Sequence, residues 1–191
     1  MTENLESQLK DLFDAWRDVH VRKGWGERFF EDGLPGYEEA YVKANPRVLY
    51  ICKESHDDGE QHVEFWFRDE VRSGPKTCQF TRRIRLLQGL ITGGDDNLEG
   101  IAFMNLDKRG GGAATYFPRL RKYTRDPEIR PLLRREIEIL APEIIVTGSC
   151  AGLVREILKG SDFTGELVDA FHPKYRRSDE KFVARFLEKR A

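Results

Sequence analysis

The sequence has few cysteines, no long apolar run and almost no net charge, and each absence excludes a class of protein. Its three cysteines are Cys52, Cys78 and Cys150. Because their number is odd and none forms a CxxC pair, neither a disulfide framework nor a cysteine-built metal centre is expected. No run approaches a membrane span, and the first ten residues lack the apolar stretch of a signal peptide. The net charge is −1, so any basic surface must be local.

The composition that remains is that of a folded protein. Of the 191 residues, 39% are hydrophobic, which is enough to form a core. We expect one domain over residues 1–191, in which an N-terminal helix and loop (1–45) pack on an α/β core (46–191). We also expect a cytoplasmic monomer that carries no metal ion and no cofactor and does not bind membranes.

Short apolar runs alternate with helical patterns along the chain. Four short apolar runs predict strands at 47–52, 100–105, 143–148 and 165–171. Helical spacing of apolar residues predicts helices over the first twenty residues and at 62–72, 79–90, 126–140, 149–158 and 178–187. The glycine-rich segment 109–115 is expected to be a flexible loop. Strands that alternate with helices indicate βαβ units and a parallel sheet.

The residues that follow the four strands differ in kind from those that precede them. The following segments are 53–59, 105–112, 148–152 and 172–177, and each carries polar or ionisable groups or glycine. The preceding segments are typical of ordinary turns. In an open parallel sheet, ligands bind beyond the carboxyl ends of the strands. The sequence therefore predicts a site at this one edge.

Five side chains at that edge could carry out chemistry. The carboxylates of Glu54, Asp57 and Asp58 could hold or activate a water molecule. Asn105 offers both a donor and an acceptor, which can read the edge of a base. His172 could donate a hydrogen bond to an oxyanion. The alternatives are a solvated acidic loop, an asparagine that caps a turn and a structural histidine.

Several further groups could meet phosphates. Gly148 and Ser149 precede a predicted helix and would offer backbone N–H groups to an anion. The basic residues near the strand ends could contact a DNA backbone, and they are Lys108, Arg109, Lys174, Arg176 and Arg177. The alternative is that they only aid solubility. Neither a phosphate-loop motif nor a dinucleotide-binding motif is present.

Four segments together resemble the uracil-DNA glycosylase superfamily. They are VLYICKESHDD, IAFMNLDKRGG, LAPEIIVTGS and AFHPKYR, and the resemblance covers about residues 47 to 177 in order and spacing. It implies a three-layer α/β/α sandwich around a four-stranded parallel sheet. It also implies an enzyme that flips uracil or another deaminated base out of single- or double-stranded DNA and hydrolyses its N-glycosidic bond.

The resemblance also implies a role for individual residues. Asn105 would recognise the base, His172 would stabilise the charge on the leaving base, and Glu54 would orient or activate water. Phe65 or Phe67 would stack on the base. The basic residues around Lys174 would lie where the family's minor-groove loop contacts DNA.

The first motif departs from the family pattern. Lys53 stands where the family has glycine, and Ser55 stands where its best-known branch has aspartate. Both residues are expected to contact the substrate. Lys53 could act there as a new catalytic group, or it could bind a phosphate. The departure keeps a second hypothesis open, a catalytically altered or inactive member that binds nucleic acid or a nucleotide. A third is a protein-interaction module.

Overall fold

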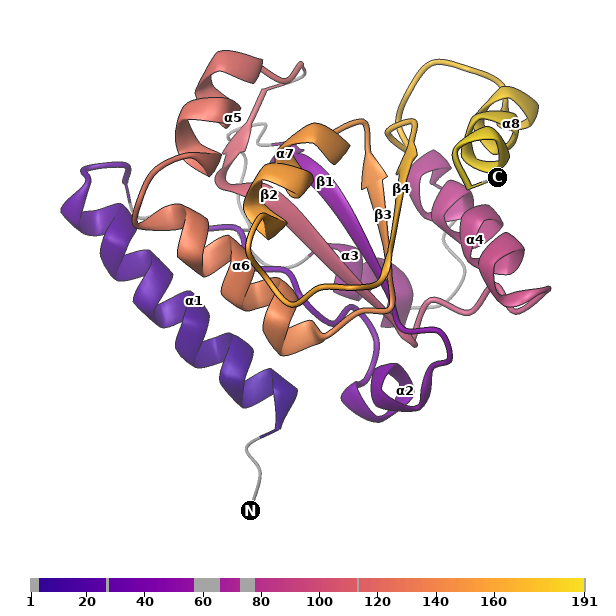
Figure 1. Cartoon of the computed structure of the whole chain (residues 1–191), viewed down its shortest axis with the longest axis horizontal. Helices are drawn as coiled ribbons and strands as arrows, with labels where there is room; N and C mark the ends of the chain where they lie inside the picture. Colours follow the sequence, from indigo (N-terminus) through magenta and orange to yellow (C-terminus); the bar gives the residue numbers. More distant parts are fainter. Residues whose placement is uncertain (1–3, 27, 57–65, 73–77, 113, 191) are drawn as a thin grey trace.

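A parallel β-sheet forms the centre of the molecule (Figure 1). The computed structural model describes residues 4–26, 28–56, 66–72, 78–112 and 114–190. The strands are β1 (Val48–His56), β2 (Ile101–Gly111), β3 (Ile144–Gly148) and β4 (Glu166–Ala170). They lie in the order β2-β1-β3-β4, and every neighbouring pair is parallel. The predicted α/β class and parallel sheet are therefore confirmed.

The described helices are α1 (Leu5–Arg22), α2 (Glu38–Lys43), α3 (Trp66–Arg72), α4 (Gln79–Thr92), α5 (Phe117–Thr124), α6 (Ile129–Leu140), α7 (Ala151–Leu158) and α8 (Asp179–Arg190). Each predicted helix is present where the structure describes it, with differences of up to three residues at the ends, and residues 62–65 of the helix predicted at 62–72 lie outside the described residues. The Asn4 side chain caps α1 by accepting a hydrogen bond of 2.8 Å from the backbone N–H of Ser7. Helices α2 and α5 were not predicted.

Helices cover both faces of the sheet. Alternate residues of β1 face opposite sides, so Leu49 and Ile51 join a core with α1, α6 and α7. Val48 and Tyr50 join a second core with α3, α4 and α8. Figure 1 shows the sheet between these two groups of helices, which is consistent with a three-layer α/β/α sandwich.

Two details of the predicted elements are wrong. Strand β2 continues to Gly111, so residues 109–111 pair in the sheet where a flexible loop was expected. Leu90 of α4 and Leu187 of α8 belong to the apolar spacing that predicts helices at 79–90 and 178–187 and would therefore face the core, but they are 40% and 48% exposed. The buried apolar side chains are Phe80, Ile84, Leu87 and Ile91 in α4 and Phe182 and Phe186 in α8. The apolar face of each helix is therefore narrower than the sequence suggested.

The strands run in one direction, so their carboxyl ends share one edge of the sheet, at the top of Figure 1. Within the described ranges, no helix is both long enough and apolar enough to cross a membrane. The N-terminal segment is tied to β2 by a bridge in which Gly33 and Phe103 exchange two backbone hydrogen bonds of 2.8 Å. This bridge brings Asp32 next to Asn105 of β2.

Candidate functional site

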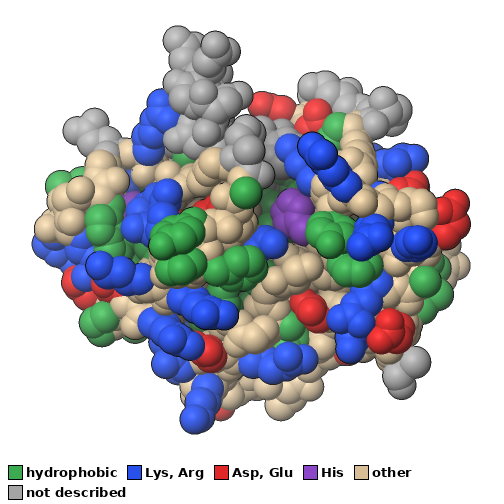
Figure 2. Space-filling view, turned by 90° about the horizontal axis from the view of Figure 1, so that it is seen from above, with side chains coloured by type: hydrophobic (Ala, Val, Ile, Leu, Met, Phe, Trp, Pro, Cys, Tyr) green, Lys and Arg blue, Asp and Glu red, His purple; other side chains and the backbone are tan. Residues whose placement is uncertain are grey.

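A pocket of about 660 Å³ opens at the carboxyl edge of the sheet. Figure 2 looks onto this edge and shows a hollow that contains a histidine side chain, with basic and hydrophobic side chains on both sides. Six of the residues predicted for the site line this pocket, namely Lys53, Glu54, Ser55, Asn105, His172 and Lys174. The two strands β1 and β2 and the segment after β4 therefore bring these residues together.

Asn105 is held by two hydrogen bonds at the base of the pocket. Its backbone N–H donates to a carboxylate oxygen of Asp32 at 2.5 Å, and its side-chain Nδ2 donates to the hydroxyl of Ser55 at 3.0 Å. Only 3% of Asn105 is exposed. An amide has two N–H donors and an oxygen acceptor, so one donor and the acceptor remain for a ligand. Ser55 thus orients the asparagine.

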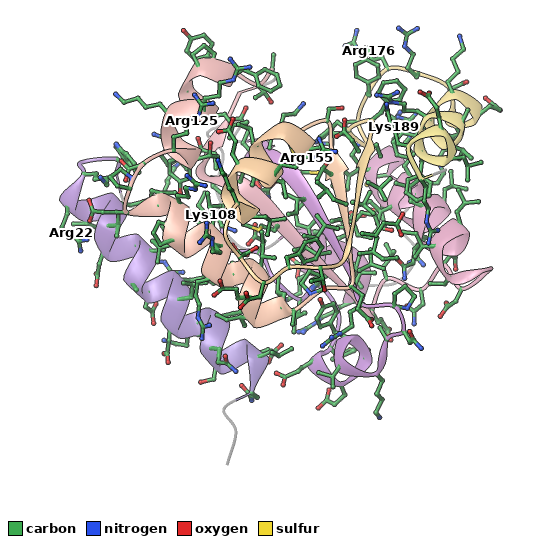
Figure 3. The ribbon with its side chains drawn as sticks, viewed as in Figure 1. Arg22, Lys108, Arg125, Arg155, Arg176 and Lys189 are labelled. Carbon is green, nitrogen blue, oxygen red and sulfur yellow. The ribbon has the colours of Figure 1, made fainter. Side chains whose placement is uncertain are left out.

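Lys108 lies in the core beside Phe13 and Trp16 and not on the surface, so its predicted contact with a DNA phosphate is wrong. It is fully buried, and its Nζ forms ion pairs with Asp32 and, at 2.9 Å, with Glu136 (labelled Lys108 in Figure 3). Burial and the neighbouring Asp32 carboxylate raise the pKa of Glu136. The lysine therefore fixes Asp32, which in turn fixes the backbone of Asn105.

The carboxyl group of Glu54 lies against the end of β2. Burial raises its pKa, and a hydrogen bond with Thr115 opposes that change. A Cβ atom placed on Gly111 would stand only 2.2 Å from Cδ of Glu54. Only glycine at position 111 leaves room for the Glu54 carboxyl group in the pocket. The raised pKa of Glu54 suits a group that accepts a proton from water.

His172 is neutral and has a defined tautomer. Burial, together with the charges of Lys53 and Lys174, lowers its pKa to about 4. The backbone N–H of Lys174 donates to Nδ1 at 3.2 Å, so the hydrogen of the neutral ring is on Nε2. Gly148 lets β3 approach the ring closely, because a Cβ there would lie 3.2 Å from Cδ2 of His172. A neutral Nε2–H donor can stabilise an anion without transferring its proton.

Arg83 of α4 holds the loop between β4 and α8 and was not predicted from the sequence. Its side chain is 1% exposed and donates to the backbone carbonyls of Pro173 at 2.9 Å, Tyr175 at 2.7 Å and Arg177. It also pairs with Asp179 at 3.0 Å. Helical spacing gave no sign of this role, since arginine in an amphipathic helix normally faces solvent. This buried arginine therefore holds the backbone of the loop that follows the pocket histidine.

The aromatic wall of the pocket is formed by other residues than those predicted. Phe80 and Phe103 line the pocket, together with Phe117 and Tyr175. Phe67 is fully buried behind them, with its ring centroid 5.6 Å from that of Phe80 and 5.0 Å from that of Phe103. Its predicted stacking on a base is therefore wrong.

Part of the predicted site lies outside the described residues. This applies to Phe65 and to the carboxylates of Asp57 and Asp58. Their predicted roles stay predictions.

Two more of the predicted phosphate contacts are wrong. Arg109 donates to the Asp107 carboxylate through Nε and Nη2 and lies between the rings of Trp25 and Tyr123, with its Cζ 4.7 Å and 4.4 Å from their centroids. The backbone N–H of Ser149 donates to Ala170 at 2.9 Å, so it is not available to an anion. Both residues stabilise the fold.

Cationic groups nevertheless surround the opening. Lys53 and Lys174 line the pocket, and Nζ of Lys53 lies 5.3 Å from the ring centroid of Phe117. Arg176 is exposed on the loop between β4 and α8, where Figure 3 labels it at the upper edge of the molecule. These three remain suitable for contact with phosphate.

The cysteines near the pocket do not supply a nucleophile. Burial raises the pKa of Cys52 to about 12 and that of Cys150 well above its usual value, so both stay protonated thiols at neutral pH. In the part of the chain that the structure describes, no group of three or more His, Cys, Asp or Glu side chains is placed to hold a metal ion. The groups with chemistry to offer are thus a carboxyl, an amide, an imidazole and an amine.

Comparison with models of known protein families gave no match, and comparison with curated proteins gave none either. Function has to be inferred from the pocket itself.

Proposed function

We propose that this protein is a DNA N-glycosylase, similar to the uracil-DNA glycosylase superfamily, which removes uracil or another deaminated base. One observation carries the proposal most directly. Glu54, Asn105 and His172 come from three separate segments and line one pocket with aromatic walls. A flipped base needs a planar slot, a hydrogen-bonding group for its edge and a donor for the charge it acquires. Aromatic wall residues, the Asn105 amide and the His172 imidazole are the groups that support these three roles here.

Recognition of the base is assigned to Asn105. Its amide is fixed by Ser55 and by the buried pair of Asp32 and Lys108, so it presents one donor and one acceptor in a set orientation. A fixed amide can distinguish bases by the order of donors and acceptors on their edge. The rings of Phe80 and Phe103 supply an apolar surface for the base plane.

Hydrolysis is assigned to Glu54 and His172. The Glu54 carboxylate accepts a proton from water as the water oxygen bonds to C1′ of the deoxyribose. The bond between C1′ and the base nitrogen breaks, and its electron pair leaves with the base. The Nε2–H of neutral His172 donates a hydrogen bond to the oxygen that carries the resulting negative charge. The free base takes up a proton, and an abasic site remains in the strand.

An assay of base release tests this function. Oligonucleotides that contain deoxyuridine, deoxyinosine or deoxyxanthosine are incubated with the protein and then with alkali, which cleaves abasic sites. We expect cleavage for at least one of them, and we expect Asn105→Ala and His172→Ala to reduce it by a factor of 100 or more while both variants stay folded. No cleavage by the folded protein on any of the three would refute the proposal.

A second candidate is favoured by Lys53. A lysine stands in the first motif where the family has glycine, and it shares the pocket with Lys174. Two ammonium groups would attract an anionic ligand, so the protein could bind a nucleotide or nucleic acid without cleaving it. Binding that weakens with salt, together with no base release, would favour this candidate.

A further inference from the structure

We propose that the preferred substrate is single-stranded DNA, with the bases next to the target stacked on aromatic side chains at two opposite rims of the pocket. The inference rests on the proposed function, because it assumes that a base of a DNA strand enters the pocket. It is carried by a different set of observations, namely exposed aromatic rings beside cationic side chains.

The first rim is the start of α5. Tyr116 is 67% exposed and Phe117 is 39% exposed, although both are large aromatic residues. Phe117 lines the pocket, and the ammonium group of Lys53 lies 5.3 Å from its ring centroid. Burying these rings would be favourable, so their exposure at a pocket indicates a surface that becomes covered when a ligand binds.

The second rim is the loop between β4 and α8. Tyr175 lines the pocket, is 45% exposed, and stacks on Phe171 with centroids 5.1 Å apart and an interplanar angle of 15°. The Cζ atom of Arg177 lies 5.8 Å from the Tyr175 ring centroid. Arg83 fixes the backbone of this loop, so the ring is held ready for a ligand.

Both rims carry an excess of basic side chains although the whole chain is nearly neutral. Residues 115–125 contain four Lys or Arg side chains, of which Arg119 and Arg125 pair with Asp107 and Glu156 of other segments. Residues 172–177 contain three, and neither segment contains an acidic residue. Figure 2 shows basic and hydrophobic side chains together on both sides of the hollow. Cationic and aromatic side chains in alternation are typical of surfaces that follow a single strand, because phosphates meet the cations and bases stack on the rings.

The stacking requires free base faces. In a duplex each base is covered above and below by its neighbours, so aromatic rings can reach a base face only by unstacking a step at a cost of a few kcal/mol. In a single strand the faces are accessible without breaking base pairs. Two aromatic rims on either side of one pocket therefore favour a single strand over a duplex.

Binding measurements test this preference. The affinity of the full-length protein is measured by fluorescence anisotropy for a labelled 15-nucleotide strand with one deoxyuridine, for its duplex, and for the RNA of the same sequence. We expect the single DNA strand to bind at least tenfold more tightly than the duplex. Tyr116→Ala and Tyr175→Ala should each weaken single-strand binding about tenfold.

Tyr37→Ala is the matched control. Tyr37 is 49% exposed and has the guanidinium carbon of Arg72 at 4.9 Å from its ring centroid, but it lines a different pocket. We expect its removal to leave DNA binding unchanged. All three tyrosines are exposed, so circular dichroism should show that the variants remain folded.

Three results would overturn the inference: equal or tighter binding of the duplex, unchanged binding by both rim variants, or tighter binding of RNA than of DNA. Base release is measured on the same strands so that the two proposals fail separately. Single-strand binding that depends on the rim tyrosines, without base release, would refute the glycosylase and keep the binding surface. Equal base release from the single strand and the duplex, together with unchanged DNA binding by the two rim variants, would refute the single-strand preference and keep the glycosylase.

Discussion

The carboxyl group of Glu54 occupies the space where residue 111 would carry its side chain. A Cβ atom on Gly111 would stand 2.2 Å from Cδ and 2.5 Å from Oε2 of Glu54. Strands β1 and β2 pair in parallel up to this point, with Glu54 opposite Asp107 and His56 opposite Gly111 in the register. The proposed general base is thus positioned by a glycine on the neighbouring strand.

We predict that Gly111→Ala displaces the Glu54 carboxyl group and lowers the rate of base release at least tenfold. The methyl group cannot be accommodated at 2.2 Å, so the side chain of Glu54 must move. Single-turnover rates measure the effect. Gly152→Ala is the control, because a Cβ on Gly152 meets no atom within 4 Å. Full activity in Gly111→Ala would mean that the position of Glu54 does not matter.

The activity should fall in acid with a midpoint above the ordinary glutamate pKa of 4.5. Burial raises the pKa of Glu54, and the reaction needs its ionised form, so activity decreases as pH falls through that raised pKa. His172 gains a proton only near pH 4, so it does not set this limb. The measurement is kcat/KM between pH 4.5 and 8. If a Glu54→Gln variant shows the same fall of kcat/KM in acid, the titrating group is not Glu54.

Arg83→Lys should lower kcat at least tenfold by loosening the loop that carries His172. A lysine cannot donate to three carbonyl groups in the arrangement that the guanidinium group uses. The ¹⁵N chemical shifts of the His172 ring provide a second readout, because they should show loss of the single Nε2–H tautomer. Arg82→Lys is the control, since Arg82 contacts the same Asp179 but is 55% exposed. One unchanged tautomer in Arg83→Lys would contradict the positioning role.

The buried His20 should make the fold less stable in mild acid. Burial lowers its pKa to about 4, whereas the unfolded chain takes up the proton near the usual value of 6.5. The unfolded state therefore binds more protons between these two values, and stability is lost as pH falls from 6.5 to 4.

The loss should reach about 3 kcal/mol for this one residue. Urea unfolding of the protein and of His20→Gln at several pH values measures it. The two free energies of unfolding should approach each other as the pH decreases. Parallel curves for the two proteins would show that His20 titrates normally.

The sequence was sufficient to predict that Glu54, Asn105 and His172 lie together at one edge of the sheet. Glu54 and Asn105 lie in the carboxyl-terminal parts of β1 and β2 and His172 follows β4, and a parallel sheet brings such positions to one edge. This prediction needed only the direction of the strands. It did not depend on which helices cover them.

The sequence was not sufficient to predict how long the strands are. Strand β2 continues past Asn105 to Gly111, so Lys108 lies within the sheet and points to Asp32 and Glu136, which come from distant segments. A buried lysine is rare without partners, and these partners can be recognised only once the chain is folded. The phosphate contacts predicted near this strand failed for the same reason.

The most direct test of the account is the release of free base from a deoxyuridine-containing single strand in a single turnover, detected by mass spectrometry. The account predicts that the protein releases uracil and that Glu54→Gln, Asn105→Ala and His172→Ala each slow the release at least a hundredfold. Release at an unchanged rate by all three folded variants would contradict it, because the chemistry would then take place outside this pocket.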